Sequence, residues 1–327
     1  MSVAIHTRID EFRRQRRVHA GSLIVSLFGD VVLPRGGRVW LGSLIHLLGP
    51  LGINERSVRT AVFRLTKDEW LCSEALGRRS EYRLTTSGER RCADAARQIY
   101  AARAPHWDRR WRQILVLGAF AQKDREALRR ALFWQGFGAL GAECFVHPSA
   151  DLPRVLDALL ADGLAHLLAG LMPLLAADAS LVGTAGNADL VARAWDLREL
   201  GQAYAEFVST YNSVLVELRS DPLATADEEG AFLLRLLLIH DYRRLLLRDP
   251  ELPEQLLPAE WPGERARLLC KDLYRRLLVP AERHLDRLLL TADGVCPPLQ
   301  PIVYERFAED DPLRCLRLDV SDHAGEK

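Results

Sequence analysis

The stretch Ile53–Leu71 most constrains the fold of this chain, because it predicts a short helix with one apolar face and one basic face. Asn54 is a good N-cap, since its side-chain oxygen can accept a hydrogen bond from a backbone N–H of the first turn. The apolar positions that recur at helical spacing are Val58, Ala61, Val62 and Leu65. Arg56, Thr60 and Lys67 lie opposite this stripe, and Arg59 and Arg64 lie on its flanks. Three arginines within nine residues are more than a helix packed on a core requires. That pattern is typical of a helix that enters the major groove of DNA.

Length and charge indicate a chain of more than one domain. For 327 residues, two or three domains are expected. The chain has 44 basic and 44 acidic residues, yet residues 1–100 hold 17 Lys and Arg against 10 Asp and Glu. The remainder of the chain cancels this surplus of seven (17 − 10). A basic domain joined to an acidic one is the charge distribution expected of a DNA-binding protein with a second activity.

The cysteines and the apolar runs indicate the cellular compartment. Six cysteines are scattered without close pairs, which is neither a zinc pattern nor a disulfide framework. The apolar run Ser22–Leu33 contains Asp30 and lacks a small-residue cleavage site, so it does not read as a signal peptide. Leu233–Ile239 is too short to span a bilayer and contains Arg235. We therefore expect a cytoplasmic protein that does not act in a membrane.

The first 104 residues predict a basic arm followed by a small DNA-binding fold. Residues 1–20 form the arm, and its basic stretch Glu11–Gly21 either adds phosphate contacts or is a solvated tail. Of these two, we favour a modest electrostatic contribution. In residues 21–104, three helical patterns precede a hairpin pattern with its turn at Gly77–Ser80. A further helix, Ser87–Ala104, ends before Pro105. Helix, helix, turn, helix and basic hairpin is the order of a winged helix-turn-helix domain.

The remainder predicts a mixed domain, a helical domain and a tail. Residues 105–180 follow the order β-α-β-α-β, with the last strand over Leu164–Met172, and predict a ferredoxin-like α+β domain. Residues 181–290 are almost wholly helical by periodicity. Residues 291–327 form a Pro-rich, acidic tail that we expect to be loosely ordered. The predicted fold class is mainly α with α+β.

Two tryptophans stand among arginines at the start of the mixed domain. Trp107 and Trp111 are four residues apart, so on a helix they would share one face. We expect the pair to pack at a domain interface.

Two long segments resemble one known family. The run Ser22–Leu71 is similar to the DNA-binding domain of the PaaX family, which are repressors of bacterial phenylacetic acid catabolism genes. Leu238–Gly263 is similar to the C-terminal domain of that family, and Ala194–Phe207 fits the beginning of the same domain. The resemblance runs from about Gly21 to about Leu290 in the family's order of domains. It implies a homodimeric repressor that releases its operator DNA when it binds phenylacetyl-CoA.

Catalytic activity is not expected. The central domain of the family is similar in fold to a small CRISPR-associated nuclease-like subunit, whose class carries an acidic metal ligand at the end of the first strand. Here that strand ends at Leu117–Ala119 without a carboxylate. Metalloprotease, hydrolase, P-loop and dinucleotide motifs do not occur, and the glycine cluster Gly183–Asp189 follows no strand pattern. We therefore expect no catalytic residues, no metal and no cofactor.

The DNA-binding candidates lie on the basic helix and the hairpin turn. Arginine and lysine neutralise phosphates and release counterions, whereas side chains that project into the groove read bases. The eight candidates are Arg56, Ser57, Arg59, Thr60, Arg64, Lys67, Arg78 and Arg79. The alternative is a solvated charged helix face beside a hairpin. Phe63 departs from this polar face, and it either contacts a thymine methyl group or packs under the hairpin.

The effector candidates lie in the helical region. A CoA thioester presents phosphates, adenine and an acyl group, so its site needs cations beside apolar and aromatic walls. The eight candidates are Trp195, Tyr204, Tyr211, His240, Arg243, Arg244, Arg248 and Trp261. For each of them, helix packing or ion pairing is the structural alternative.

The sequence leaves three functions open. The first is a repressor of aromatic-acid catabolism genes that responds to a CoA thioester. The second is a thioesterase-like enzyme that binds a CoA thioester and carries a DNA-binding domain. The third is an architectural DNA-binding dimer without an effector.

Overall fold

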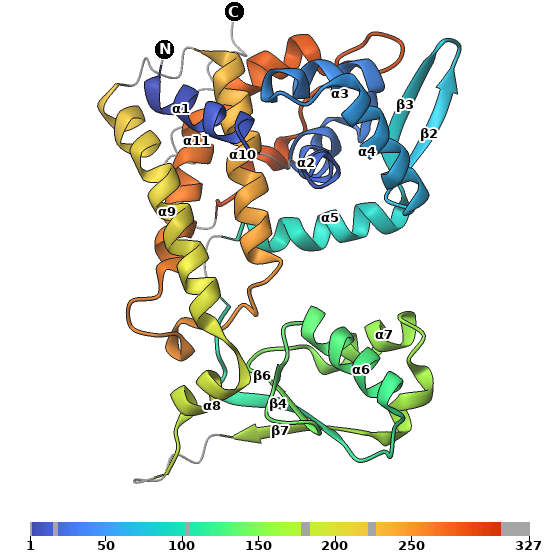
Figure 1. Ribbon diagram of the computed structural model, residues 1–327, viewed down its shortest axis with the longest axis vertical. Coiled ribbons are helices and arrows are strands. Elements are labelled where there is room, and N and C mark those ends of the chain that lie inside the picture. Colours follow the sequence, from blue (N-terminus) through green and yellow to red (C-terminus); the bar gives the residue numbers. More distant parts are fainter. Residues whose placement is uncertain (1, 16–18, 102–104, 178–183, 222–226, 309–327) are drawn as a thin grey trace, which may run out of the picture. The chain divides into compact units, whose positions relative to one another are not determined.

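The computed structural model describes residues 2–15, 19–101, 105–177, 184–221 and 227–308. Most of these residues are helical, and the strands form two small antiparallel sheets, which confirms the predicted mainly α class with α+β parts (Figure 1). Contacts divide the chain into two compact units. The first contains residues 1–102, 205–247 and 265–327, and the second contains 103–204 and 248–264. This grouping differs from the consecutive blocks expected from the sequence.

The helices and strands of each unit follow in chain order. The first unit contains α1 (Val3–Arg13), α2 (Ala20–Leu27), β1 (Arg38–Trp40), α3 (Leu41–Leu48), α4 (Glu55–Lys67), β2 (Leu71–Leu76), β3 (Arg79–Leu84), α5 (Thr86–Ile99) and α10 (Glu228–Leu246). The second contains β4 (Arg110–Val116), α6 (Gln122–Trp134), β5 (Gly138–Ala139), β6 (Cys144–His147), α7 (Leu152–Ala161), β7 (Leu171–Ala177) and α8 (Asn187–Ala194). Two long helices supply residues to both units, α9 (Leu197–Ser220) and α11 (Pro262–Leu288).

Helix α10 is the centre of the first unit. Every residue from Gly230 to His240 is buried, so this helix is enclosed on all sides. A helix that is apolar around its whole circumference is expected inside a core, and here α1, α2 and α5 pack on it. The core of the first unit therefore combines segments from both ends of the sequence.

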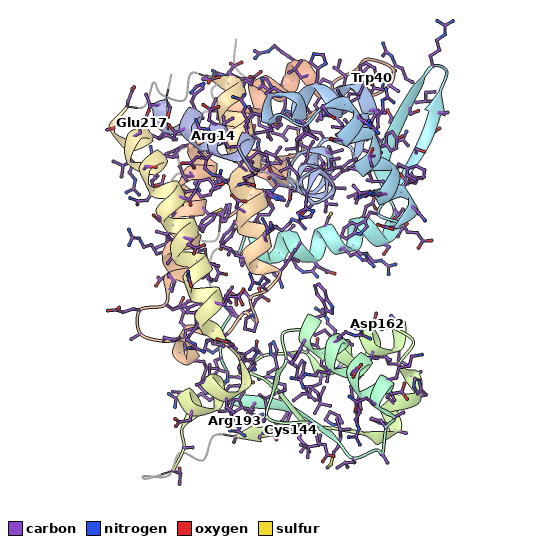
Figure 2. All side chains as sticks on the ribbon, in the orientation of Figure 1. Arg14, Trp40, Cys144, Asp162, Arg193 and Glu217 are labelled. Atoms are coloured by element: carbon purple, nitrogen blue, oxygen red, sulfur yellow. The ribbon has the colours of Figure 1, made fainter. Side chains whose placement is uncertain are left out.

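The N-terminal residues of α1 are packed in the core, so the alternative of a solvated tail is wrong for the part of the arm that α1 contains. Ile5, Ile9 and Phe12 are at most 3% exposed, and their spacing places them on one helix face. Glu217 of α9, labelled in Figure 2, accepts hydrogen bonds from two backbone N–H groups at the start of α1, each at 2.8 Å. An apolar stripe thus holds α1 in the core despite its arginines. The rest of the expected basic arm includes Arg16–Val18, which lie outside the described residues.

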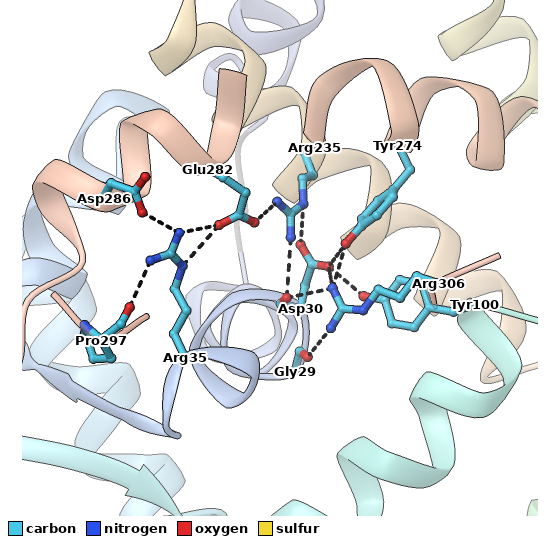
Figure 3. Close-up of polar contacts among 10 residues, drawn as sticks. All are labelled: Gly29, Asp30, Arg35, Tyr100, Arg235, Tyr274, Glu282, Asp286, Pro297 and Arg306. Atoms are coloured by element: carbon cyan, nitrogen blue, oxygen red, sulfur yellow. Dashed lines mark hydrogen bonds and ion pairs between the residues drawn. The ribbon is translucent and has the colours of Figure 1, made fainter. Parts of the chain in front are cut away.

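A network of buried charges joins α2 to the C-terminal helices (Figure 3). Its centre is Asp30, fully buried in the π-helical turn Phe28–Val32 that follows α2. The carboxylate pairs with Arg235 of α10 at 2.9 Å and with Arg306 at 2.8 Å, and it accepts a hydrogen bond from the Tyr100 hydroxyl at 2.6 Å. Burial by itself would raise the pKa of Asp30, but the two guanidinium groups outweigh this and hold the pKa below its ordinary value.

Glu282 of α11 extends the same network. One of its oxygens accepts from Arg235, and the other accepts from Arg35 at 2.6 Å. Arg35 also pairs with Asp286 at 2.7 Å. The formal charges of the network balance, because the carboxylates of Asp30, Glu282 and Asp286 face the guanidinium groups of Arg35, Arg235 and Arg306. Buried charges are tolerated only in such paired, hydrogen-bonded arrangements.

The C-terminal segment contradicts the loosely ordered tail that was expected, as far as residue 308. Arg306 belongs to the charge network, and Phe307 is 1% exposed with its ring edge-on to Tyr100 at 5.4 Å between centroids. The carbonyl of Phe307 accepts from Arg275 of α11 at 2.9 Å. These contacts fix the segment because a buried cation and a buried aromatic ring need partners in the core. Residues from 309 onward lie outside the described part of the chain.

The second unit is built on a four-stranded sheet in the order β5-β6-β4-β7. The helices α6 and α7 pack on it through a core that includes Ile114, Leu132, Phe145 and Leu159. The predicted alternation of strands and helices is confirmed, with β5 as an additional short strand. The last strand begins at Leu171 and not at Leu164, because a 3-10 helical segment precedes it.

The tryptophan pair does not lie on a helix. Trp111 is in β4 and Trp107 precedes that strand in irregular structure, so the predicted shared helix face is wrong. The two rings nevertheless contact each other, with centroids 5.7 Å apart. They pack with Val146, Val191 and Leu252 in a core of the second unit.

The network gives a stability prediction for Asp30→Asn. Loss of this carboxylate charge leaves Arg235 and Arg306 without their shared partner in the core, and removing one partner of a buried ion pair costs about 3–5 kcal/mol. The matched change Asp10→Asn breaks an exposed pair with Arg13, for which a loss below about 1 kcal/mol is expected. Urea unfolding followed by circular dichroism measures both free energies. Equal losses for the two variants would contradict the role assigned to Asp30.

Candidate functional site

Helix α4 presents the basic face predicted from the sequence. The Asn54 side chain accepts from the backbone N–H of Ser57 at 2.9 Å, which confirms the N-cap. The four apolar residues of the inner face are buried, as expected: Val58, Ala61, Val62 and Leu65. Arg56, Arg64 and Lys67 are exposed on the other side. The helix is therefore fixed by its apolar face and offers its cations to solvent.

Two other polar residues of α4 have partners within the helix. Arg59 pairs with Glu55 one turn earlier, at 2.7 Å. The Thr60 hydroxyl donates to the carbonyl of Arg56 at 2.8 Å. Because exposed ion pairs of this kind are weak, Arg59 can exchange Glu55 for another anion at small cost.

The two arginines of the hairpin differ in their environment. The hairpin β2–β3 extends away from the helices (Figure 1). Strand β3 also pairs with β1, a short strand that the sequence did not reveal. Arg78 is exposed in the turn. Arg79 donates to the carbonyl of Ala292 at 2.8 Å, and its guanidinium lies 4.7 Å from the ring centroid of Trp40, which Figure 2 labels. Arg79 is thus held against the protein, whereas Arg78 is available to a ligand.

Phe63 is 71% exposed on the outer face of α4. Of the two alternatives for this residue, packing under the hairpin is therefore excluded. Its ring is therefore available for an apolar contact with a bound partner.

A groove lies beside α4, and we call it the α4–α10 groove. Its volume is about 770 Å³, and it is bounded by the end of α1, the start of α2, α4 and the C-terminal part of α10. Its polar lining includes Arg56, Ser57, Thr60 and Arg64 of α4 together with His240, Asp241 and Arg244 of α10. Phe12, Ala61 and Leu65 add apolar surface. Four of the eight DNA-binding candidates and two of the eight effector candidates therefore share one groove.

The groove is electropositive. The carboxylate of Asp241 is balanced by Arg8 of α1 at 2.6 Å and accepts from the Tyr211 hydroxyl at 2.8 Å. The other charged side chains of the lining are three cations, Arg56, Arg64 and Arg244, and one anion, Asp68. The excess of cations favours an anionic ligand.

His240 forms a buried, neutral part of the groove wall. It is 6% exposed, and its Nδ1 lies 3.0 Å from the Ser26 hydroxyl, which also accepts from Arg243 at 3.0 Å. Burial lowers the pKa of His240 to about 4, against the opposing effect of Asp241. At neutral pH the ring is therefore uncharged.

The effector candidates are distributed over both units. Tyr211, His240, Arg243 and Arg244 belong to the first unit, and Trp195, Tyr204, Arg248 and Trp261 belong to the second. In the first unit only His240 and Arg244 line the groove, because Tyr211 and Arg243 are engaged with Asp241 and Ser26.

The four candidates of the second unit have structural partners. The ring of Trp195 stacks on Trp111 at 6.3 Å, and its N–H donates to the carbonyl of Gly136 at 3.1 Å. Tyr204 donates to Asp249 at 2.5 Å and lies edge-on to Trp261, with centroids 5.8 Å apart. Arg248 pairs with Glu199. Each of these four residues therefore has a packing or pairing role within the protein, which was the structural alternative to effector binding.

Sequence reasoning missed the groove because its walls are far apart in the chain. Phe12 and His19 line it beside α4, yet both fall in the expected basic arm. The apolar stripe of α1 was the one signal that pointed to a packed N-terminus. In the described part of the chain, no cluster of three or more His, Cys, Asp or Glu side chains is arranged to hold a metal ion. No helix among the described residues is long and apolar enough to cross a membrane.

The buried state of His240 gives a pH prediction. Between pH 6.5 and 4 the unfolded chain binds a proton that the folded chain excludes, so the free energy of unfolding falls on acidification, by about 2 kcal/mol at pH 5. In His240→Asn the amide keeps a partner for Ser26 but does not titrate. Urea unfolding at pH 7.5 and pH 5 should give a smaller loss for the variant. If the variant and the wild type lose the same free energy of unfolding between pH 7.5 and pH 5, His240 does not contribute to the pH dependence.

Comparison with known proteins identifies the family. Residues 19–88 match the PaaX-like protein family, and residues 195–287 match the PaaX-like protein C-terminal domain. "Transcriptional repressor PaaX" of Escherichia coli (strain K12) is 39% identical over 294 residues, which are 89% of this chain and 90% of that protein. A solved structure, "Uncharacterized protein Rv0674 from Mycobacterium tuberculosis", is 26% identical with a TM-score of 0.46, covering 74% of this chain and 89% of the other. The resemblance read from the sequence is confirmed, and the chain belongs to the PaaX family.

Proposed function

We propose that this protein is a DNA-binding transcriptional repressor that reads its operator with α4. The observation that supports this most is the exposed basic face of a helix whose other face is buried and whose N-terminus is capped. The relative from Escherichia coli, which aligns over nearly the whole chain, bears the name of a transcriptional repressor and not of an enzyme. A regulator without catalytic activity is therefore the function that we assign.

The elements around α4 support a winged helix-turn-helix reading. In this proposal α2, α3 and α4 are the three helices, and α4 enters the major groove. The turn Gly49–Gly52 separates α3 from α4, and Gly52 adopts a φ of 80°, a left-handed conformation that suits glycine. The hairpin β2–β3 is the wing, with Arg78 at its tip. In the second unit, two helices on an antiparallel sheet favour the ferredoxin-like reading in the same way.

In this proposal the basic face of α4 contacts both the phosphates and the bases of the DNA. Arg56, Arg64 and Lys67 neutralise phosphates or donate to guanine, for which a bidentate arginine contributes about 1–3 kcal/mol of discrimination. Phe63 contacts a thymine methyl group. Arg78 binds the backbone beside the groove, whereas Arg79 mainly stabilises the hairpin through Trp40 and Ala292.

The regulated genes and the effector follow from the family resemblance. We propose that the protein acts as a homodimer, represses phenylacetic acid catabolism genes, and leaves its operator when phenylacetyl-CoA binds. The electropositive α4–α10 groove supports an anionic effector. The thioester would be a ligand and not a substrate.

The first experiment tests DNA binding. Arg64→Ala should weaken affinity for a duplex selected by the wild type from a random pool, by about tenfold, and should lower the slope of log affinity against log salt by about one. Arg283→Ala is the control, because it removes one exposed cation from α11 that does not line the α4–α10 groove. Fluorescence anisotropy at several salt concentrations measures both. If both Arg64→Ala and Arg56→Ala bind the duplex as tightly as the wild type does, the DNA-binding assignment is wrong.

The second experiment tests the effector. Phenylacetyl-CoA should release the duplex while the thioester stays intact, measured by anisotropy and by chromatography of the same sample. Hydrolysis of the thioester would instead favour a CoA-thioester-binding enzyme, and indifference would favour an architectural DNA-binding dimer. Release by free phenylacetate would overturn the choice of the thioester.

A further inference from the structure

The α4–α10 groove unites two segments that lie far apart in the sequence. One wall belongs to the N-terminal region that matches the family, and the other belongs to its C-terminal domain. Both walls lie within the first compact unit, where α2 contacts α4 and α10. A ligand in this groove would therefore touch α4 directly.

The lining defines the chemistry of such a ligand. Three exposed guanidinium groups, Arg56, Arg64 and Arg244, supply donors suited to phosphate oxygens. The hydroxyl groups of Ser57 and Thr60 add weaker polar contacts. Apolar surface beside these cations suits an organic group attached to the phosphate. A volume of about 770 Å³ is in the range of small-molecule sites.

We propose that the α4–α10 groove binds a phosphate-bearing organic anion and that an occupied groove excludes DNA. The reason is shared residues: Arg56, Ser57, Thr60 and Arg64 line the groove and also belong to the proposed DNA-reading face. This inference rests on the proposed function, since it requires that α4 contact DNA. It deepens that function, because release would follow from direct competition and not from a motion transmitted between distant sites.

A small molecule fits the groove better than the DNA backbone does. Part of the lining is apolar, namely Ala20 and the edges of Phe12, Ala61 and Leu65, which are each at most 9% exposed. A phosphodiester chain has no apolar group to place against such surface. Arg244 projects from α10 and completes the cationic lining opposite α4.

Competition and allosteric coupling give different titrations. Under mutual exclusion, the apparent Kd for the duplex rises in proportion to ligand concentration without limit. Coupling between separate sites has a finite free energy, so the apparent Kd would level off, typically after a change of about 5–150-fold. The full-length wild type is titrated with pyrophosphate, free coenzyme A and phenylacetyl-CoA at fixed ionic strength. A linear rise supports the proposal, and a plateau overturns the exclusion of DNA.

Variants locate the site independently of DNA. Calorimetry without DNA should show that Arg244→Ala binds the same ligands about tenfold more weakly, the effect expected for one charged hydrogen bond. Arg283→Ala loses the same charge from α11 and should match the wild type. Unchanged ligand affinity in Arg244→Ala, or no saturable binding of any of the three probes to the wild type, overturns the groove as the site.

Failure of the proposed function would look different. If the wild type binds no duplex, both the proposed function and the exclusion of DNA are wrong. An affinity for the ligand that depends on Arg244 would still support the anion site. If Arg244→Ala weakens DNA binding more than Arg283→Ala does, and lowers the salt slope, the groove holds the DNA backbone. That result would overturn the small-molecule assignment and leave DNA binding by α4 intact.

Discussion

The pairing of Asp30 with Arg235 is the interaction on which the first unit most depends. Both side chains are essentially inaccessible to water, and a lone charge in such a place would be too costly for a folded chain. Each ion therefore requires the other, although 205 residues separate them in the sequence. Glu282 and Arg306 complete the arrangement from α11 and from the C-terminal segment. Four segments must be in place together before any one of these charges is satisfied.

This requirement extends to α4. Asp30 lies in the π-helical turn that follows α2, and α2 packs on both α4 and α10. Core contacts and hydrogen-bonded ions thus fix the position of α4 beside α10. The same contacts therefore fix the shape of the groove between these two helices. Hydrogen-bonded ion pairs are directional, whereas apolar contacts are not, so the network specifies one arrangement among the several that burial alone would allow.

Local signals account for what could be predicted from the sequence. Asn54 caps α4, and Val58, Ala61, Val62 and Leu65 face the core, because capping and periodicity depend on neighbours within a few residues. The strand β1 and the role of Arg235 depend on partners far along the chain, so no local pattern reveals them. Trp111 shows the ambiguity of short spacings, since four residues after Trp107 suits a helix face and yet the chain there forms β4. The candidate site divides in the same way. Arg64 of α4 and Arg244 of α10 could each be singled out from the sequence, whereas their meeting in one groove depends on long-range contacts.

The enclosure of α10 also bears on how this chain could have evolved from smaller parts. A DNA-reading segment that folds by itself can be moved between proteins as a cassette. Here α1, α2 and α5 rest on a helix encoded after residue 227, so the first 102 residues lack the centre of their own core. Residues 1–102 and α10 are therefore expected to change together in evolution, because each buries apolar surface of the other.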